Sequence, residues 1–495
     1  MKRRRSLIAL VAAGSFVLAA CTGAGKPTEQ ATDVSAGGGT EPEATAGVEG
    51  EALPADGAAG TSDANPSAAT GTGTRKPTAG AGATTNATTP GGAPAPTSGA
   101  TQLPPTQTTL FAANEDRIGI TKDKLVLCAH AALTYGAAFN TGVDDLKVYF
   151  DAINAEQGGI YGRKVEITYE NDDYKPEPAV QAATTCQAKN PFMLLGGIGF
   201  DQIPAVRNWA ESNRMLYLHH TATVNGAAGK EFSFSPLPST EKMGEIFGEL
   251  AASRFKGKRI GIIKRNSPNW EPGVAAFKAI AAKHGVQVVA EVGVEASKGN
   301  YLPELLAMQN AQADVVFAWE NALAATEMIV QSKRQSQDFE WLLFPFNLTS
   351  QTLDRDALNP KLTGIAMFTA YSYGDKGGTF APYADDITEF ERQYAKFRPS
   401  ADLDGLAGDL LFLNWTAMKA LHLQLLDCGQ DCTRNRFIDV MKTYKKKPMS
   451  SACEIDFTRG GGHLGGWAVN VMETYDAPGD KVNWRNTDSC VEHLL

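Results

Sequence analysis

The chain has 495 residues and a formal net charge of −9, and 43% of its residues are hydrophobic. An acidic chain of this kind does not suit a nucleic-acid surface, which requires a basic patch, so nucleic acid is excluded as a partner. After the first 21 residues, no apolar run approaches the length that spans a bilayer. The chain from about residue 110 to residue 495 has globular composition and is too long for one ordinary domain. Two lobes with separate cores are therefore expected.

The first 21 residues have the pattern of a signal peptide. A basic segment, Lys2–Arg5, precedes an apolar run, Leu7–Ala20, that is too short for a stable transmembrane helix. The run ends in Leu-Ala-Ala-Cys, which resembles the bacterial lipobox; a plain cleavage site is the alternative. The resemblance implies that Cys21 is acylated and becomes the mature N-terminus. The chain is then expected to be extracytoplasmic and lipid-anchored to the outer face of the cell membrane.

Residues 22–108 are predicted to form a disordered tether. They are mostly Ala, Gly, Thr, Pro, Ser and Glu, with very few large apolar residues. Such a segment cannot bury enough apolar surface to offset the entropy lost on ordering. Its root-mean-square reach is roughly 50 Å by the scaling of flexible linkers, which would hold a folded domain away from the membrane.

Beyond the tether, short apolar runs alternate with longer segments of helical period. This alternation indicates an α/β fold with parallel sheets. The candidate strands are Lys124–Ala129, Val165–Tyr169, Phe192–Leu195, Met215–Leu218, Arg259–Ile263, Val286–Ala290, Asp314–Ala318, Trp341–Pro345 and Ile365–Thr369. The helix after the first strand places Val143, Leu146, Phe150 and Ile153 on one face, and Gly158-Gly159 supplies the positive φ that ends it.

Several segments resemble the type I periplasmic binding proteins, a family that includes the branched-chain amino-acid receptors of ABC importers. The segments that carry the resemblance, in chain order, are Ala152–Lys164 with Val165–Asp173, Lys258–Ile263, Phe277–Gly285, Ala313–Phe317, Ala407–Leu426 as a long buried helix, and Asp456–His463 as a turn between the last strands. The resemblance covers essentially all of residues 110–495.

The resemblance implies two Rossmann-like lobes with parallel sheets, joined by a three-segment hinge that closes around a ligand in the cleft. It places the chain crossings near residues 235–239, 353–360 and 445–450. The expected lobes are then residues 109–237 with 356–447, and residues 238–355 with 448–495.

Six further cysteines in an exported chain favour disulfides over metal ligands. The preferred pairs join Cys128 to Cys186, Cys428 to Cys432, and Cys453 to Cys490. They rest on placing each pair in one coarse structural neighbourhood, and six cysteines allow 15 pairings. The spacing Cys-x-x-x-Cys at 428–432 could instead suggest zinc, but no second ligand pair with usable spacing accompanies it.

The first-lobe ligand contacts follow from the resemblance. Tyr135 lies in the loop after the first strand and could equally be an ordinary surface aromatic. Phe200 and Asp201 stand where the family has small hydroxyl residues that hold a ligand carboxylate. An ionised Asp201 would repel such a ligand, or it could cap the following helix instead. Thr221 and Thr223 could donate hydrogen bonds to a ligand oxygen.

In the second lobe, Trp270 best matches the family's aromatic contact. Phe346 occupies the place where amino-acid receptors have an acidic residue that pairs with the ligand ammonium. Glu320 is the candidate to replace that charge, although exposure at the rim is the commoner fate of such a residue.

These residues favour a solute-binding protein that delivers a small molecule to an ABC permease in the membrane. The loss of both amino-acid anchors predicts an aromatic or otherwise apolar ligand, and not a simple branched-chain amino acid. A sensor that signals ligand occupancy without transport is the alternative, because fold alone does not separate the two. No catalytic or nucleotide-binding motif is present, so neither an enzyme nor a cofactor is expected.

Overall fold

The computed structural model describes residues 105–134, 142–197, 199, 201–220, 222–295, 298–343, 361–366, 384–403, 405–477 and 481–495. The predicted signal peptide, Cys21 and the predicted tether up to residue 104 lie outside the described residues. The chain divides into two units, Met1–Pro94 and Ala95–Leu495, and the described residues all belong to the second unit.

The first sheet has eight strands among the described residues, in the order β11-β12-β13-β5-β4-β3-β1-β2. Neighbouring strands from β2 through β13 run parallel, and β12 and β11 continue antiparallel at one edge. The strands are β1 (Lys124–Ala131), β2 (Lys164–Asn171), β3 (Met193–Gly196), β4 (Tyr217–Leu218), β5 (Ser233–Pro238), β11 (Lys445–Lys446), β12 (Ile455–Asp456) and β13 (Leu464–Gly466).

The second sheet has seven strands among the described residues, in the order β15-β14-β10-β9-β8-β6-β7. Strands β7 through β10 are parallel, and β14 and β15 are antiparallel. The strands are β6 (Arg259–Arg265), β7 (Gln287–Val294), β8 (Val315–Trp319), β9 (Glu340–Leu343), β10 (Leu362–Ala366), β14 (Val469–Ala477) and β15 (Lys481–Val491).

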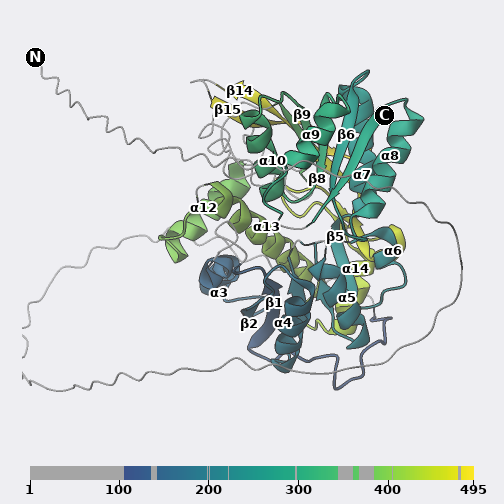
Figure 1. Ribbon diagram of the computed structural model, residues 1–495. Coiled ribbons are helices and arrows are strands. Elements are labelled where there is room, and N and C mark those ends of the chain that lie inside the picture. The colour runs from purple at the N-terminus through teal and green to yellow at the C-terminus, as the bar shows by residue number, and fades with distance from the viewer. Residues whose placement is uncertain are drawn as a thin grey trace, which may run out of the picture. The chain divides into compact units, whose positions relative to one another are not determined.

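Helices cover both sheets, and Figure 1 shows α3, α4 and α5 around the first sheet and α7 to α10 around the second. Each sheet with its helices is called a lobe below. The described helices are α2 (Val143–Leu146), α3 (Val148–Glu156), α4 (Pro176–Ala188), α5 (Gln202–Ser212), α6 (Val224–Ala227), α7 (Thr240–Arg254), α8 (Glu271–Lys283), α9 (Leu302–Asn310), α10 (Ala322–Arg334), α12 (Ala384–Phe397), α13 (Gly405–Cys428), α14 (Arg434–Thr443) and the short 3-10 helix η3 (Gly460–Gly462).

Each predicted strand has a counterpart among the described residues, because its apolar run suits a parallel strand that is covered on both faces. Residues 344–345 and 367–369 of the last two predicted strands lie outside the described residues. All five residues of β8 are buried, as are five of the seven in β6. The predicted first helix is interrupted at Lys147 and forms α2 and α3. Gly158 and Gly159 have φ of 78° and 90°, as expected for the end of that helix.

Sheet membership corrects two of the three expected chain crossings. The first crossing agrees, since β5 lies in the first sheet and α7 then packs against α8 in the second lobe. The segment 356–447 was assigned to the first lobe, but its β10 pairs with β9 and β14 in the second sheet. The segment 448–495 was assigned to the second lobe, but β12 and β13 pair in the first sheet. The sheet that each of these strands joins is decided by hydrogen bonds between segments far apart in the chain. A local sequence pattern does not indicate such pairing.

The structure has the three disulfides preferred from the sequence: Cys128–Cys186, Cys428–Cys432 and Cys453–Cys490. The first joins β1 to α4 within the first lobe. The third joins the segment before β12 of the first sheet to β15 of the second sheet. It therefore adds a covalent link between the two lobes, beyond the chain crossings themselves.

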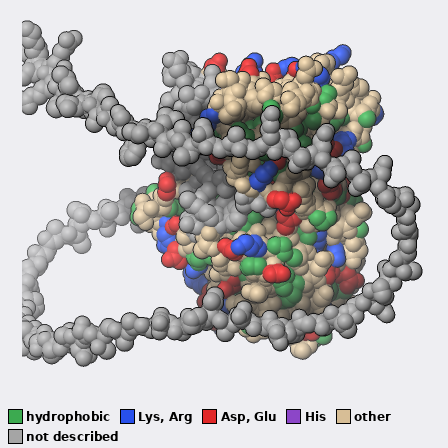
Figure 2. Space-filling model, viewed as in Figure 1, with side chains coloured by type: hydrophobic (Ala, Val, Ile, Leu, Met, Phe, Trp, Pro, Cys, Tyr) green, Lys and Arg blue, Asp and Glu red, His purple; other side chains and the backbone are tan. Residues whose placement is uncertain are grey.

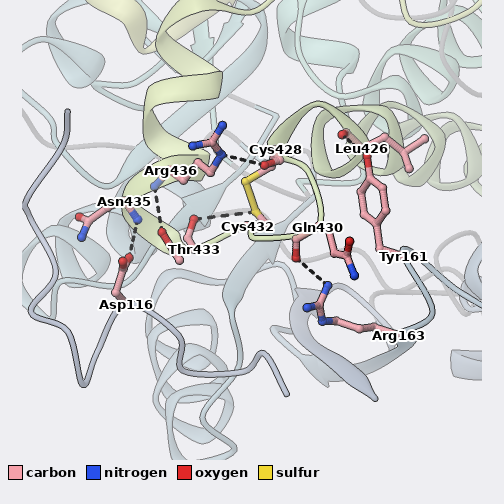
Figure 3. Close-up of a disulfide and its surroundings, with 10 residues drawn as sticks. All are labelled: Asp116, Tyr161, Arg163, Leu426, Cys428, Gln430, Cys432, Thr433, Asn435 and Arg436. Atoms are coloured by element: carbon pink, nitrogen blue, oxygen red, sulfur yellow. Dashed lines mark hydrogen bonds between the residues drawn. A yellow bond between two sulfur atoms is a disulfide. The ribbon is translucent and has the colours of Figure 1, made fainter. Parts of the chain in front are cut away.

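The Cys428–Cys432 disulfide closes the turn between α13 and α14 (Figure 3). Arg436 Nε donates to the carbonyl oxygen of Cys428 at 3.0 Å. From the other side, Arg163 Nη1 donates to the Gln430 carbonyl at 2.9 Å, and a Tyr161 hydroxyl donates to a carbonyl of α13. These contacts tie the turn to the β2 side of the first lobe.

Candidate ligand-binding site

The parallel strands of both sheets follow the same order. It is β2-β1-β3-β4-β5 in the first sheet and β7-β6-β8-β9-β10 in the second. In each sheet the order reverses between the first and third strands, at β1/β3 and β6/β8. A crevice forms at the carboxyl ends of the strands at such a point, and ligands of open α/β sheets bind there. The loops after β3, β6 and β8 carry the predicted contacts Asp201, Trp270 and Glu320.

Asp201 occupies the N-cap position of α5, but its side chain makes no capping hydrogen bond. One carboxylate oxygen instead accepts a hydrogen bond from the Ser267 hydroxyl, and the other lies 3.4 Å from Nη1 of Arg265. Arg265 ends β6 and Ser267 follows it, so these contacts join the first lobe to the second. The alternative that the Asp201 carboxylate caps the helix is therefore wrong, because that carboxylate contacts two residues of the second lobe instead.

Arg265 and Glu320 form a buried ion pair at the ends of β6 and β8. Their side chains are 4% and 1% exposed. Arg265 Nε donates to both oxygens of Glu320, at 3.0 Å and 2.8 Å, and Nη2 donates to one of them as well. Asn321 Nδ2 adds a further hydrogen bond to Glu320 at 3.1 Å. This arrangement occupies the Glu320 carboxylate with contacts from its own lobe.

The environment of this pair shifts both pKa values. Burial alone would lower the pKa of Arg265, but the hydrogen bonds and charge of Glu320 outweigh it and raise that pKa. Burial also raises the pKa of Glu320, and Arg265 offsets this only in part. Glu320 is thus not exposed at a rim, which corrects that expectation, and its pairing with a ligand ammonium stays a prediction. A buried charge needs a hydrogen-bonded partner of opposite charge, and Arg265 supplies it.

Trp270 packs against this ion pair and is fully buried. The Arg265 guanidinium is 5.3 Å from the centre of its ring, within cation–π distance. Trp319 Nε1 donates to the Trp270 carbonyl at 3.0 Å, and the two rings meet edge to face. Trp270 therefore packs against the Arg265 guanidinium and helps to fix its position. Stacking of a ligand on Trp270 remains a prediction.

A buried chain of polar groups lies under the first-lobe loops. His130, at the end of β1, is within 2.7 Å of Asp172 through Nδ1 and within 2.7 Å of the Tyr217 hydroxyl through Nε2. A Cβ added at Gly196 would lie 2.3 Å from that hydroxyl. These hydrogen-bonded side chains thus join β1, β4 and the end of β2. They also pack directly against Gly196, where the segment that leads to Asp201 begins.

The loop after β4 is held by its own hydrogen bonds. The Thr223 hydroxyl caps α6 by accepting from the Gly226 amide at 2.8 Å. Its proton is not required for the cap, so its role as a ligand donor stays a prediction. His220 Nδ1 is 2.9 Å from the Gly196 carbonyl, and burial lowers the pKa of His220. Tyr135, Phe200, Thr221 and Phe346 lie outside the described residues.

The surface carries both signs of charge. On the face in Figure 2, acidic and basic side chains are interspersed. Among the described residues, no three His, Cys, Asp or Glu side chains come together in a way that could hold a metal ion. Within the same part of the chain, no helix has the length and apolarity needed to cross a membrane.

Solved structures show the same fold. A fatty-acid ABC transporter substrate-binding protein from Thermomonospora curvata aligns with a TM-score of 0.60 and 16% identity, covering 76% of this chain and 94% of its own. A solute-binding protein from Rhodopseudomonas palustris in complex with 3,4-dihydroxybenzoic acid aligns at 0.59 and 16%, covering 75% and 99%. A leucine-binding protein from Thermotoga maritima aligns at 0.59 and 14%, covering 74% and 99%. These similarities establish a type I periplasmic-binding-protein fold.

Residues 133–473 match the periplasmic binding protein family, and the chain belongs to it. Proteins of this family bind solutes outside the cytoplasm and are not enzymes. No curated protein matches the sequence.

Two residues of the site, Arg265 and Ser267, were not predicted from the sequence. Both follow a predicted strand, and a basic residue at the carboxyl end of a buried strand was the available signal. Asp201, which both residues contact, is 64 and 66 residues away from them in the chain, so the signal did not indicate this contact.

Proposed function

We propose that this chain is the solute receptor of an ABC importer, anchored to the outer face of the membrane through lipidated Cys21. Its tether, residues 22–108, would let the folded part reach ligand and permease. The lobes would close on a small organic molecule at the two strand-order reversals. Family membership and the two-lobe fold support this proposal. The similar structures, which include substrate-binding proteins of ABC transporters and one with a bound solute, give it further support.

The ligand is proposed to be aromatic or otherwise apolar, and not a simple branched-chain amino acid. The observation that carries this proposal is that the carboxylates of Asp201 and Glu320 are both already bound by other groups of the protein. Asp201 is directed at Ser267 and Arg265, and the Glu320 carboxylate is bound by Arg265. An α-amino acid needs a donor set for its carboxylate and an acceptor for its ammonium. These residues offer neither without first breaking their own contacts.

Calorimetric titration with leucine, isoleucine and valine tests the proposal. We expect no binding in the micromolar range for any of the three, whereas mass spectrometry under native conditions should detect a small molecule that copurifies. Micromolar affinity for one of the three would contradict the ligand assignment. A protein that carries no small molecule, and whose thermal unfolding no solute shifts, would contradict the receptor function.

A further inference from the structure

The contacts of Asp201 resemble an occupied anion site. Its carboxylate lies at the N-terminus of α5, which carries a partial positive charge, and faces a hydroxyl and a guanidinium from the other lobe. Each of these three groups favours a carboxylate. The carboxylate present there belongs to the protein.

Arg265 is already bound by two carboxylates of the protein itself. Nε and Nη2 bind Glu320, which leaves Nη1 as the edge that faces Asp201. A carboxylate ligand is bound best by two parallel N–H groups of a guanidinium. While Glu320 holds the Nε–Nη2 side of Arg265, the Nη1–Nη2 edge is the remaining pair of donors, and the Asp201 carboxylate already lies against its Nη1. An acid that entered the cleft would have to displace Asp201 and compete with Glu320.

The charge of the cluster also opposes an acid. Asp201 and Glu320 contribute two negative charges and Arg265 one positive charge, so the three groups sum to −1. Arg265 and Glu320 are almost fully buried, and Asp201 is 28% exposed. Charges interact more strongly in such surroundings than in water. The cluster therefore repels a third carboxylate and attracts a cation or a hydrogen-bond donor.

We propose that Asp201 determines specificity: its carboxylate takes the place of a ligand carboxylate, so the transported molecule presents a neutral or cationic head group to the cleft. This inference rests on the proposed receptor function. It separates the chain from the similar structures that are in complex with acids, 3,4-dihydroxybenzoic acid and benzoate. The apolar part of the ligand is unaffected by this argument.

The test compares benzoate with benzamide and benzylamine, which share the ring and differ in the head group. In calorimetric titrations, the natural chain should bind benzamide or benzylamine roughly tenfold or more tightly than benzoate. Asp201→Ser removes the built-in carboxylate and should strengthen benzoate binding by a similar factor. Asp201→Asn keeps the size of the side chain and removes its charge, which provides a second variant if the first does not fold. Asp338→Ser, at a side chain that is 92% exposed, is the matched control and should change nothing.

The copurifying molecule separates the possible failures. A neutral molecule or an amine supports the inference. A carboxylic acid, or benzoate bound as tightly by the natural chain as by Asp201→Ser, overturns it and leaves the receptor function standing. If no small molecule copurifies and none of the three probes binds to any variant, the receptor function and the inference both fail.

Discussion

His422 lies in α13, and its Nδ1 is 2.9 Å from the Tyr149 hydroxyl of α3. Burial lowers the pKa of His422 from 6.5 to about 4. Between these two pH values the unfolded chain binds a proton that the folded chain does not. The stabilisation is therefore complete above pH 6.5 and is lost as the pH falls toward 4, by up to roughly 3 kcal/mol.

Replacing this histidine should flatten the acid side of the stability profile. We expect the free energy of unfolding of His422→Gln to fall less steeply than that of the natural chain between pH 6.5 and pH 4. Denaturant unfolding at a series of pH values measures this. Because burial also lowers the pKa of His220 and His463, part of the decline should remain.

His284→Gln is the matched control, since His284 is exposed at the end of α8 and its replacement should leave the profile unchanged. A profile of His422→Gln that runs parallel to that of the natural chain would show that His422 is not responsible for the decline.

The site residues show where prediction from sequence stops. Asp201 and Glu320 were placed correctly after strands, because strand ends can be recognised from the apolar runs that precede them. Their partners could not be predicted, since Arg265 and Ser267 reach Asp201 only after two sheets have formed and faced one another. The Glu320 carboxylate was expected at a rim and is buried, because a cation from a neighbouring strand compensates it.

The disulfides differ in how much chain they close. Cys128 and Cys186 are 58 residues apart in sequence, whereas Cys428 and Cys432 are four apart. In the loop-entropy description, a disulfide stabilises a protein by restricting its unfolded chain, and the effect grows with the length of the closed loop. It predicts about 4 kcal/mol for the longer loop and about 2 kcal/mol for the shorter one.

Double alanine variants test this difference. Cys128→Ala with Cys186→Ala should lower the denaturant midpoint clearly more than Cys428→Ala with Cys432→Ala. The second pair serves as the control for removing two buried sulfurs. An equal or larger loss from the second pair would mean that the closed turn between α13 and α14, with its contacts from Arg163 and Arg436, matters more than loop length.

Among the strands that the sequence did not predict, β5 has an identifiable cause. β5 (Ser233–Pro238) is buried along its whole length, yet it contains two prolines, Pro236 and Pro238. Proline lacks the N–H that a sheet needs, so a central strand was not expected there. Strands β11 to β15 were also missed. Of these, β11 to β13 have only two or three residues each and are too short to show a hydrophobic period.

The two lobes meet through the Asp201 contacts, and this affects the conformation of the whole molecule. The Ser267 hydroxyl donates to Asp201 across the cleft. A hydrogen bond to a charged group is worth roughly 1.5–3 kcal/mol. Removing it should shift the balance between closed and open forms toward the open form by about tenfold or more.

Small-angle X-ray scattering can detect this shift. The radius of gyration of Ser267→Ala is expected to exceed that of the natural chain under the same ligand-free conditions. Ser253→Ala is the control, because the Ser253 hydroxyl bonds within α7 to the Glu249 carbonyl and should not affect closure. Identical scattering from the natural chain and Ser267→Ala would rule out a role for this hydrogen bond in closure.

The amino-acid sequence alone predicted the α/β class, the strands of both parallel cores except β5 and β13, and the three cysteine pairs. Each of these depends on local period, on turn residues or on coarse neighbourhood. The resemblance to the family was also evident from the amino-acid sequence. The tertiary structure decided which sheet β10, β12 and β13 join and which groups surround Asp201. The physical reason is that strand pairing and ion pairing act between segments far apart in the chain, so they are fixed only when the lobes fold and meet.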